Sequence, residues 1–276
     1  MPTSHRYSGR LHPSATASVP ETASVPQVAS AHTWTLAEET PAAVLYTGAF
    51  FAVMMATPAD LADFAAGFTV TEGIAAFADI QEIRIAENLD GFLINIIIPP
   101  ERQASLDTRR RVLTGRSGCG ICGAQTLDAA VARPRPVAAA KRAATPDALA
   151  RAYAELPGLQ IINRENHSTH AAGLADAEGN LLMVREDIGR HNALDKLIGA
   201  ALTAGRALTE GFVVVSSRCS MELVQKAAMV GVPLLASVSA PTALAVRLAA
   251  EAGMVLAASS REGVMVFEPG KPGGAA

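Results

Sequence analysis

The chain has 276 residues, 50% of them hydrophobic and 18% charged, which is typical of a folded protein with one large domain or two smaller ones. Its formal charge of −3 argues against nucleic acid as a partner, because a general nucleic-acid binder needs a basic surface. No stretch reaches the roughly 18 apolar residues that span a bilayer, so we expect no membrane segment.

The first segment, residues 1–31, is rich in Ser, Pro, Thr and Ala and shows no repeating apolar face. This composition predicts a disordered tail, and the segment lacks the apolar centre of a secretory signal. The chain contains three cysteines, an odd number that does not suit a secreted disulfide scaffold. We therefore expect a cytoplasmic protein whose thiols stay reduced.

Residues 32–136 are expected to form a smaller N-terminal α+β lobe. Alternating apolar residues predict strands over residues 43–47, 50–56, 80–86 and 91–98. Thr57 as a cap and Pro58 at the first helical position predict a helix that ends near Phe68. A short basic helix over residues 105–113 precedes a glycine-rich segment.

Residues 137–276 are expected to form a C-terminal α/β lobe. Apolar patterns predict strands over 170–176, 181–186, 212–216, 233–237, 254–258 and 264–267, and helices over 145–156, 190–204, 219–230 and 241–252. Several of these strands are continuous apolar runs, which suit parallel strands buried on both faces. Strands that alternate with helices predict a three-layer α/β sandwich.

Four junctions between these elements are expected at the carboxyl ends of the strands, where ligands of such sheets bind. The junctions are residues 187–191, 216–218, 239–242 and 259–263. They combine small hydroxyl side chains and helix N-termini with Arg190, Arg218 and Arg261. Such groups favour phosphates and other anions. The alternative is that the hydroxyls are ordinary helix caps and the arginines are solvated.

The most distinctive segment is residues 115–123, GRSGCGICG, in which four glycines surround Cys119 and Cys122. The glycines give the backbone freedom to bring a sulfur atom close to another molecule. Arginines upstream, at positions 109, 110, 111 and 116, would favour the thiolate. Cys119 could then take sulfur from a donor and hold it as a persulfide, with Cys122 assisting.

Other chemistries fit the same cysteines. Cys119 and Cys122 with His167 and His170 supply four zinc ligands of the right types, as in a zinc-stabilised assembly chaperone. A dithiol redox motif is a second alternative. A zinc deaminase also uses Cys-x-x-Cys, but none of the six histidines is followed two residues later by Glu. Cys219 opens a predicted helix after an apolar strand and is interpreted as structural.

Several segments together resemble the formate dehydrogenase accessory sulfurtransferase family, FdhD. They occur in the family's order: residues 54–58 (MMATP), 67–74 (GFTVTEGI), 118–123 (GCGICG), 169–172 (THAA), 186–196 (EDIGRHNALDK), 216–218 (SSR), 224–226 (VQK) and 239–242 (SAPT). A lone Cys-x-x-Cys is a weak signal, but its combination with the EDIGRHNALDK segment is specific. The resemblance covers about residues 40–268.

The resemblance implies a homodimeric sulfurtransferase with a fold similar to cytidine deaminase. Such proteins take sulfur from a cysteine desulfurase and deliver it to the molybdenum cofactor, bis-molybdopterin guanine dinucleotide, of formate dehydrogenase. The family's persulfide carrier matches Cys119, and Cys122 matches its second cysteine. No metal site is implied.

The family's nucleotide-binding stretch matches residues 258–263, and together with the junctions it gives the expected cofactor contacts. These are Ala258, Ser259, Ser260, Arg261, Glu262, Gly263, Ser217, Arg218, Arg190 and Ser239. The sequence departs from the family at Gly263, where an arginine is common, and lacks the usual aromatic residue near Ala258. Arg261 is positioned to substitute for the missing arginine.

Overall fold

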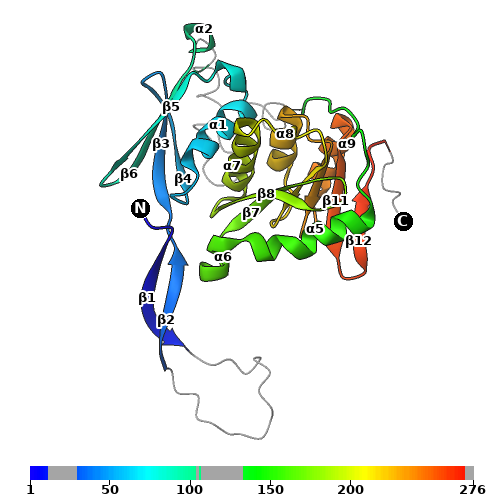
Figure 1. Ribbon diagram of the computed structural model, residues 1–276, viewed down its shortest axis with the longest axis horizontal. Coiled ribbons are helices and arrows are strands. Elements are labelled where there is room, and N and C mark those ends of the chain that lie inside the picture. The colour runs from blue at the N-terminus through cyan, green and yellow to red at the C-terminus, as the bar shows by residue number, and fades with distance from the viewer. Residues whose placement is uncertain (12–29, 104–105, 107–132, 271–276) are drawn as a thin grey trace, which may run out of the picture.

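The computed structural model describes residues 1–11, 30–103, 106 and 133–270. This part of the chain contains three β-sheets (Figure 1). A two-stranded ribbon precedes a four-stranded sheet, and a six-stranded sheet forms the C-terminal half. The predicted basic helix over residues 105–113 lies, apart from Leu106, outside the described residues.

The N-terminal sheet has the strand order β4-β3-β6-β5. Its strands are β3 (Thr40–Tyr46), β4 (Ala49–Ala56), β5 (Glu82–Asn88) and β6 (Gly91–Ile97). One face carries large buried side chains that pack against helix α1 (Leu61–Thr71), among them Tyr46 and Ile94. The four strands expected from the alternating pattern are confirmed within about three residues, because one face of this sheet is buried.

Helix α1 begins later than the sequence indicated. Its N-cap is Asp60 rather than Thr57. The Thr57 hydroxyl instead accepts a hydrogen bond from the backbone N–H of Ile188 at 3.0 Å, and the Thr57 N–H donates to the Asp187 carboxylate at 3.0 Å. The predicted cap was wrong because Thr57 is used in a tertiary contact with the C-terminal half.

The C-terminal sheet has the order β12-β11-β10-β9-β7-β8. Its strands are β7 (His170–Ala175), β8 (Leu181–Asp187), β9 (Phe212–Val215), β10 (Leu234–Ser237), β11 (Val255–Ser260) and β12 (Gly263–Phe267). Strands β9, β10 and β11 are parallel, as their apolar runs predicted, whereas the other pairs are antiparallel.

Helices cover both faces of this sheet, so the lobe has three layers (Figure 1). The helices on one face are α7 (Arg190–Thr203), α8 (Met221–Met229) and α9 (Ala243–Ala252), and α5 (Pro146–Leu159) packs on the other. The connecting segments are η1 (Phe77–Asp79), α2 (Pro100–Gln103) and α6 (Ile161–Asn166). The expected three-layer α/β arrangement is therefore present.

The two halves meet where α1 lies against α7, and two glycines set the distance between these helices. A Cβ atom on Gly67 would lie 1.8 Å from the carbonyl oxygen of Asp195. A Cβ atom on Gly199 would lie 1.9 Å from the carbonyl oxygen of Asp63. Only glycine permits this backbone approach, so the contact between the lobes depends on both positions.

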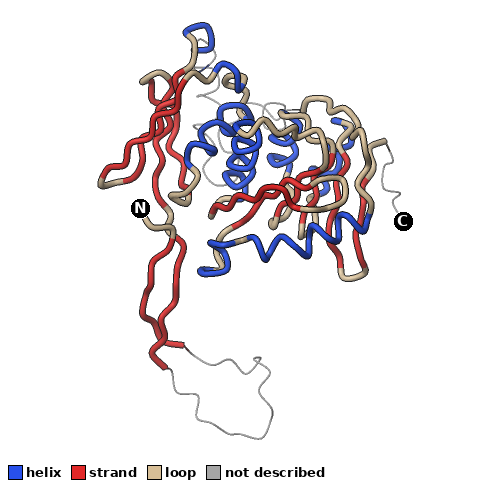
Figure 2. The backbone as a smooth tube through the Cα atoms, in the orientation of Figure 1, coloured by secondary structure: helices blue, strands red, loops and turns tan. Residues whose placement is uncertain are grey.

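The ribbon corrects part of the expectation that residues 1–31 are disordered, because residues 4–11 and 30–31 form strands, whereas residues 12–29 lie outside the described residues. Strand β1 (Ser4–Leu11) pairs antiparallel with β2 (Ser30–Ala37). The pair leaves the body of the protein below the N-terminal sheet and extends away from it (Figure 2). Its composition gave no signal because few of its residues contact a core.

Candidate functional site

The four junctions predicted from the sequence to bind anions lie together at the carboxyl edge of the C-terminal sheet. Strands β9, β10 and β11 end there, β8 ends there beside them, and β7 begins there. The register confirms this placement, since His170 pairs with Asp187 and Ser237 lies between Val215 and Ala258. Residues far apart in the sequence therefore lie at one edge. The parallel strands all end there, and the antiparallel strand β7 begins there.

Two of the predicted residues after β9 differ in exposure. The Ser217 side chain is buried, and its hydroxyl donates a hydrogen bond to the Arg218 carbonyl at 2.9 Å. Arg218 itself is exposed. After β10, the Ser239 carbonyl accepts a 2.6 Å hydrogen bond from the Ser237 hydroxyl, which fixes the turn. The hydroxyls at positions 217 and 237 thus shape the backbone, while the arginine faces solvent.

The β11–β12 turn holds the predicted nucleotide-binding stretch. Ala258 is buried in the strand, whereas Arg261 and Glu262 are exposed at the tip of the hairpin. The Ser260 hydroxyl donates to the Gly263 carbonyl at 2.9 Å and accepts from the Glu262 N–H at 3.2 Å. Gly263 has a φ of 133°, which suits a residue without a Cβ. An arginine at position 263 would be strained by this positive φ, whereas Arg261 does not have a positive φ.

The predicted residues span most of the edge. Arg190 is the first residue of α7, beside the end of β8. Ser259 lies near the end of β11, which is four strands away from β8 in the sheet. Neighbouring strands lie about 4.8 Å apart, so the two ends are separated by about 19 Å. This length suits an extended ligand such as a dinucleotide rather than a single phosphate.

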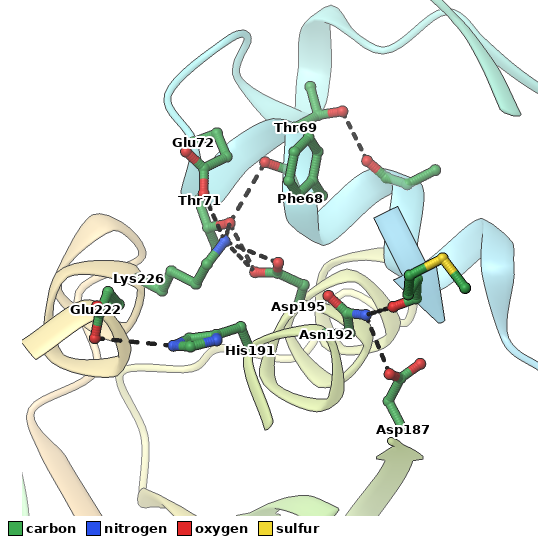
Figure 3. Close-up of polar contacts among 12 residues, drawn as sticks. Phe68, Thr69, Thr71, Glu72, Asp187, His191, Asn192, Asp195, Glu222 and Lys226 are labelled. Atoms are coloured by element: carbon green, nitrogen blue, oxygen red, sulfur yellow. Dashed lines mark hydrogen bonds and ion pairs between the residues drawn. The ribbon is translucent and has the colours of Figure 1, made fainter. Parts of the chain in front are cut away.

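The structure places two histidines at this edge, His191 and His170, the second of which the sequence had suggested only as a ligand in the zinc alternative. His170 is half-buried at the start of β7, and burial lowers its pKa, with Arg190 adding to the effect. His191 lies on α7, with its Nε2 atom 3.9 Å from the Glu222 carboxylate of α8 (Figure 3). The His191 imidazole lowers the pKa of Glu222 to about 2. The position of His191 next to Arg190 in the 187–191 junction was the available sequence signal, whereas His170 reaches the edge through strand pairing with Asp187.

Three buried polar atoms near this edge make no hydrogen bond within the described part of the chain. They are the Tyr153 hydroxyl, the Ser220 hydroxyl and Nε2 of His191. Tyr153 reaches the edge from α5, close to Ser237. Buried polar atoms are normally paired, and each of these atoms has a polar neighbour: the Tyr153 hydroxyl lies near Ser237, and the other two lie near the Glu222 carboxylate.

Other residues of the 186–196 segment stabilise the fold. Glu186 accepts the N–H groups of Ile162 and Asn163 at 2.8 Å each, which caps the start of α6. The Lys196 ammonium lies 2.7 Å from the Asp187 carboxylate, and both side chains are fully buried. Lys196 also donates a hydrogen bond to the Thr57 carbonyl at 3.0 Å, so the segment joins the two lobes while it presents Arg190 and His191 to the edge.

A second buried network lies where α1, α7 and α8 meet (Figure 3). The Lys226 ammonium contacts Asp195 at 2.8 Å, Glu72 at 2.8 Å and the Thr71 hydroxyl at 3.0 Å. Burial opposes the charge on Lys226, but the Asp195 and Glu72 carboxylates outweigh it and raise the pKa of Lys226. The ammonium therefore stays charged and ties the two lobes together.

The predicted sulfur-carrying loop, with Cys119 and Cys122, lies outside the described residues, so its role stays a prediction. Cys219 is buried as expected for a structural cysteine, and burial raises its pKa to about 12. Its thiol is therefore protonated at neutral pH and unreactive.

The two histidines of the zinc alternative are also placed. His167 is exposed at the end of α6, and His170 lies beside Arg190, whose charge disfavours a bound cation. Among the residues that the structure describes, no three His, Cys, Asp or Glu side chains gather as a metal site. In the same part of the chain, no helix combines the length and the apolar character needed to cross a bilayer.

Comparisons with known proteins show which family the chain resembles. The model of the FdhD/NarQ family matches residues 37–268. A sulfur carrier protein FdhD from Xanthomonas oryzae pv. oryzae is 51% identical over 227 residues, covering 82% of this chain and 80% of that protein. One from Bordetella bronchiseptica is 46% identical over 222 residues, covering 80% of each.

A solved structure from Desulfotalea psychrophila, of a provisionally assigned formate dehydrogenase accessory protein, has the same fold. Its TM-score is 0.70 at 24% identity, with 97% of each chain covered. The family model spans most of the chain, and the relatives match along most of their own length. The chain belongs to the FdhD/NarQ family.

Proposed function

We propose that this protein is a sulfurtransferase that carries sulfur as a persulfide on Cys119 and serves the maturation of formate dehydrogenase. The donor is a cysteine desulfurase, and the acceptor is the molybdenum cofactor, bis-molybdopterin guanine dinucleotide. Relatives at about 50% identity carry the name sulfur carrier protein. The reaction suits the cytoplasm, where thiols stay reduced.

One observation about the cysteines supports Cys119 as the carrier. The chain has three cysteines, and Cys219 is buried with a pKa raised to about 12. A sulfur carrier needs an accessible thiolate, which Cys219 does not provide. The chemistry therefore falls to Cys119 and Cys122, which are flanked by glycines and preceded by arginines in the sequence.

The first half of the reaction is a thiol–persulfide exchange. The Cys119 thiolate attacks the outer sulfur of the donor's persulfide, and a new S–S bond forms on Cys119. The donor's S–S bond breaks, and its cysteine leaves as a thiolate. Cys119 then holds the transferred sulfur for delivery to the cofactor.

The carboxyl edge supports a role in holding the cofactor's nucleotide portions. Arg218 and Arg261 are exposed there, and Arg190 is half-buried at the start of α7. Guanidinium groups and helix N-termini bind phosphates by charge-assisted hydrogen bonds. Ser217, Ser239 and residues 258–263 would complete the contacts. The expected resemblance of the fold to cytidine deaminase also belongs to this proposal.

Mass spectrometry tests the proposal directly. The full-length protein is incubated with a cysteine desulfurase and cysteine, and peptides are mapped. We expect a gain of one sulfur atom on Cys119, lost in Cys119→Ala and retained in the matched control Cys219→Ala. The proposal fails if neither loop cysteine gains sulfur while the donor itself is loaded. Stoichiometric zinc that disappears in Cys119→Ala would instead support the assembly chaperone.

A further inference from the structure

A groove of about 410 Å³ lies between the two lobes, on the side of the molecule away from the carboxyl edge. Its walls include the last turns of three helices, through Val70 of α1, Leu202 of α7 and Met229 of α8. These helices lie side by side (Figure 1). Because α7 and α8 both begin at the carboxyl edge, their ends reach the opposite side of the sheet. The volume falls within the range of about 300–1,000 Å³ that is typical of binding sites.

Two arginines line the groove, and their charges are used differently. The Arg102 guanidinium lies with its Nε atom 2.9 Å from the Asp79 carboxylate. Arg135 is exposed and forms no ion pair with any residue that the structure describes. An exposed guanidinium beside an apolar wall favours a carboxylate, which it can bind through two parallel hydrogen bonds.

The other polar groups of the groove are already satisfied. The Val70 carbonyl accepts the Gly73 N–H at 3.0 Å, and the Leu202 carbonyl accepts the Gly205 N–H at 3.1 Å. Most of the remaining wall is apolar, with Phe77 half-buried at its side. The groove therefore fits an apolar side chain that lies next to a carboxylate.

The groove also lies where the chain enters and leaves the segment that contains Cys119. Arg102 precedes Leu106, the last described residue before that segment, and Arg135 follows Arg133, where the described chain resumes. Leu106 is buried in the core of the N-terminal lobe, so this end of the segment is anchored. A molecule bound in the groove thus touches the chain on both sides of the segment.

We propose that this groove is the docking site for the protein that donates sulfur, and that it binds a part of the donor in which an apolar side chain lies beside a carboxylate. The inference rests on the proposed function, because the donor's persulfide must be brought to the Cys119 segment. Docking at both ends of that segment raises the local concentration of the persulfide around Cys119. Arg135 attracts the donor's carboxylate and speeds the encounter.

This position keeps the donor and the cofactor apart. Helix α7 begins at the carboxyl edge with Arg190 and ends at Thr203, next to the groove. At about 1.5 Å per residue, this helix separates the two sites by about 21 Å. A docked donor therefore leaves the edge open, and GDP should raise the melting temperature of groove variants as much as that of the wild type.

Two substitutions in the groove test the proposal. Arg135→Glu reverses the charge, and Ala76→Phe places a large side chain in the groove from an exposed position. Arg247→Glu, on the exposed face of α9, makes the same charge reversal outside the groove and is the matched control. Because all three positions are exposed, each variant should keep the wild-type melting temperature.

The readout is the rate at which the full-length protein gains sulfur on Cys119, followed by mass spectrometry with two donors. One donor is a cysteine desulfurase with cysteine, and the other is glutathione persulfide, which needs no docking. With glutathione persulfide, the Cys119 thiolate takes the outer sulfur and glutathione leaves as a thiolate.

At a donor concentration below saturation, Arg135→Glu and Ala76→Phe should each slow loading by the desulfurase at least tenfold, on the order of the effect of a charge on association. Loading by glutathione persulfide should be unchanged, and Arg247→Glu should behave as the wild type with both donors. Added salt should slow desulfurase loading of the wild type much more than that of Arg135→Glu, because the attraction that salt screens is absent from the variant.

The inference is overturned if the desulfurase loads both groove variants at the wild-type rate, a result that would keep the sulfur-carrier function and move donor docking elsewhere. It is also overturned if loading slows equally with both donors, because the groove would then act on the Cys119 segment itself. A wild-type protein that neither donor loads would refute the proposed function, and this inference with it.

Discussion

Lys226 on α8 and Asp195 on α7 form a buried ion pair with a 2.8 Å contact, and Glu72 at the end of α1 lies equally close to the same ammonium. The pair thus joins a residue of the N-terminal lobe to two helices of the C-terminal lobe. These helices also carry His191 and Glu222 at the carboxyl edge. The network therefore holds the edge and the N-terminal lobe in one fixed arrangement.

Removing the Lys226 charge should be strongly destabilising. Lys226→Met leaves the Asp195 and Glu72 carboxylates buried without their counter-ion, and breaking such a pair costs about 3–5 kcal/mol. Urea denaturation measures the change in the free energy of unfolding. Lys141→Met, which removes an exposed pair with Glu210, is the control and should cost less than about 1 kcal/mol. Equal effects of the two substitutions would contradict a linking role for the buried network.

The close approach of α1 and α7 predicts a low tolerance at Gly199. In Gly199→Ala the new methyl group would meet the Asp63 carbonyl, so the helices must separate, which we expect to cost about 1–3 kcal/mol or more. Gly158→Ala in α5 is the matched control, since no atom lies within 4 Å of its added Cβ. That control should be neutral or slightly stabilising in thermal melts. A Gly199→Ala melting temperature at or above the wild-type value would refute the packing argument.

Glu222 should make stability depend on acid pH. Its pKa is about 2 in the folded protein against 4.5 ordinarily, so its stabilising contribution is complete above about pH 4.5 and is lost as the pH falls towards 2. For this half-buried group the contribution is on the order of 2 kcal/mol. Glu222→Gln should therefore be less stable than wild type at pH 7, with the difference shrinking towards pH 3. Denaturation curves at both pH values test this, and a constant difference would rule out the lowered pKa of Glu222.

The exposed arginines of the carboxyl edge should govern nucleotide binding. GDP is expected to raise the melting temperature of the wild type, because a ligand that binds only the folded state stabilises it. Arg218→Ala and Arg261→Ala should each reduce this shift, since both guanidinium groups lie exposed at the edge. Arg206→Ala, just beyond the opposite end of α7, is the control and should retain the full shift. Undiminished protection in both edge variants would move the nucleotide site elsewhere.

The sequence alone determined the elements whose signals are local or periodic. The apolar runs of β9, β10 and β11 identified parallel buried strands, and from that the carboxyl edge followed, because parallel strands end on the same side. The resemblance carried by residues 118–123 and 186–196 pointed to the family that the comparisons then showed. The roles of Cys119 and Cys122 remain predictions.

Only the tertiary structure decided the contacts between distant residues. Thr57 resembled a helix cap but binds the Asp187 region, and Lys226 meets Glu72 across 154 positions of the chain. The ribbon was missed because strand pairing between residues 4–11 and 30–37 leaves no local periodic core pattern. Sequence patterns record how each residue relates to its neighbours along the chain. Buried ion pairs, glycine contacts and uncovered faces depend on which elements meet in space, and packing alone settles that.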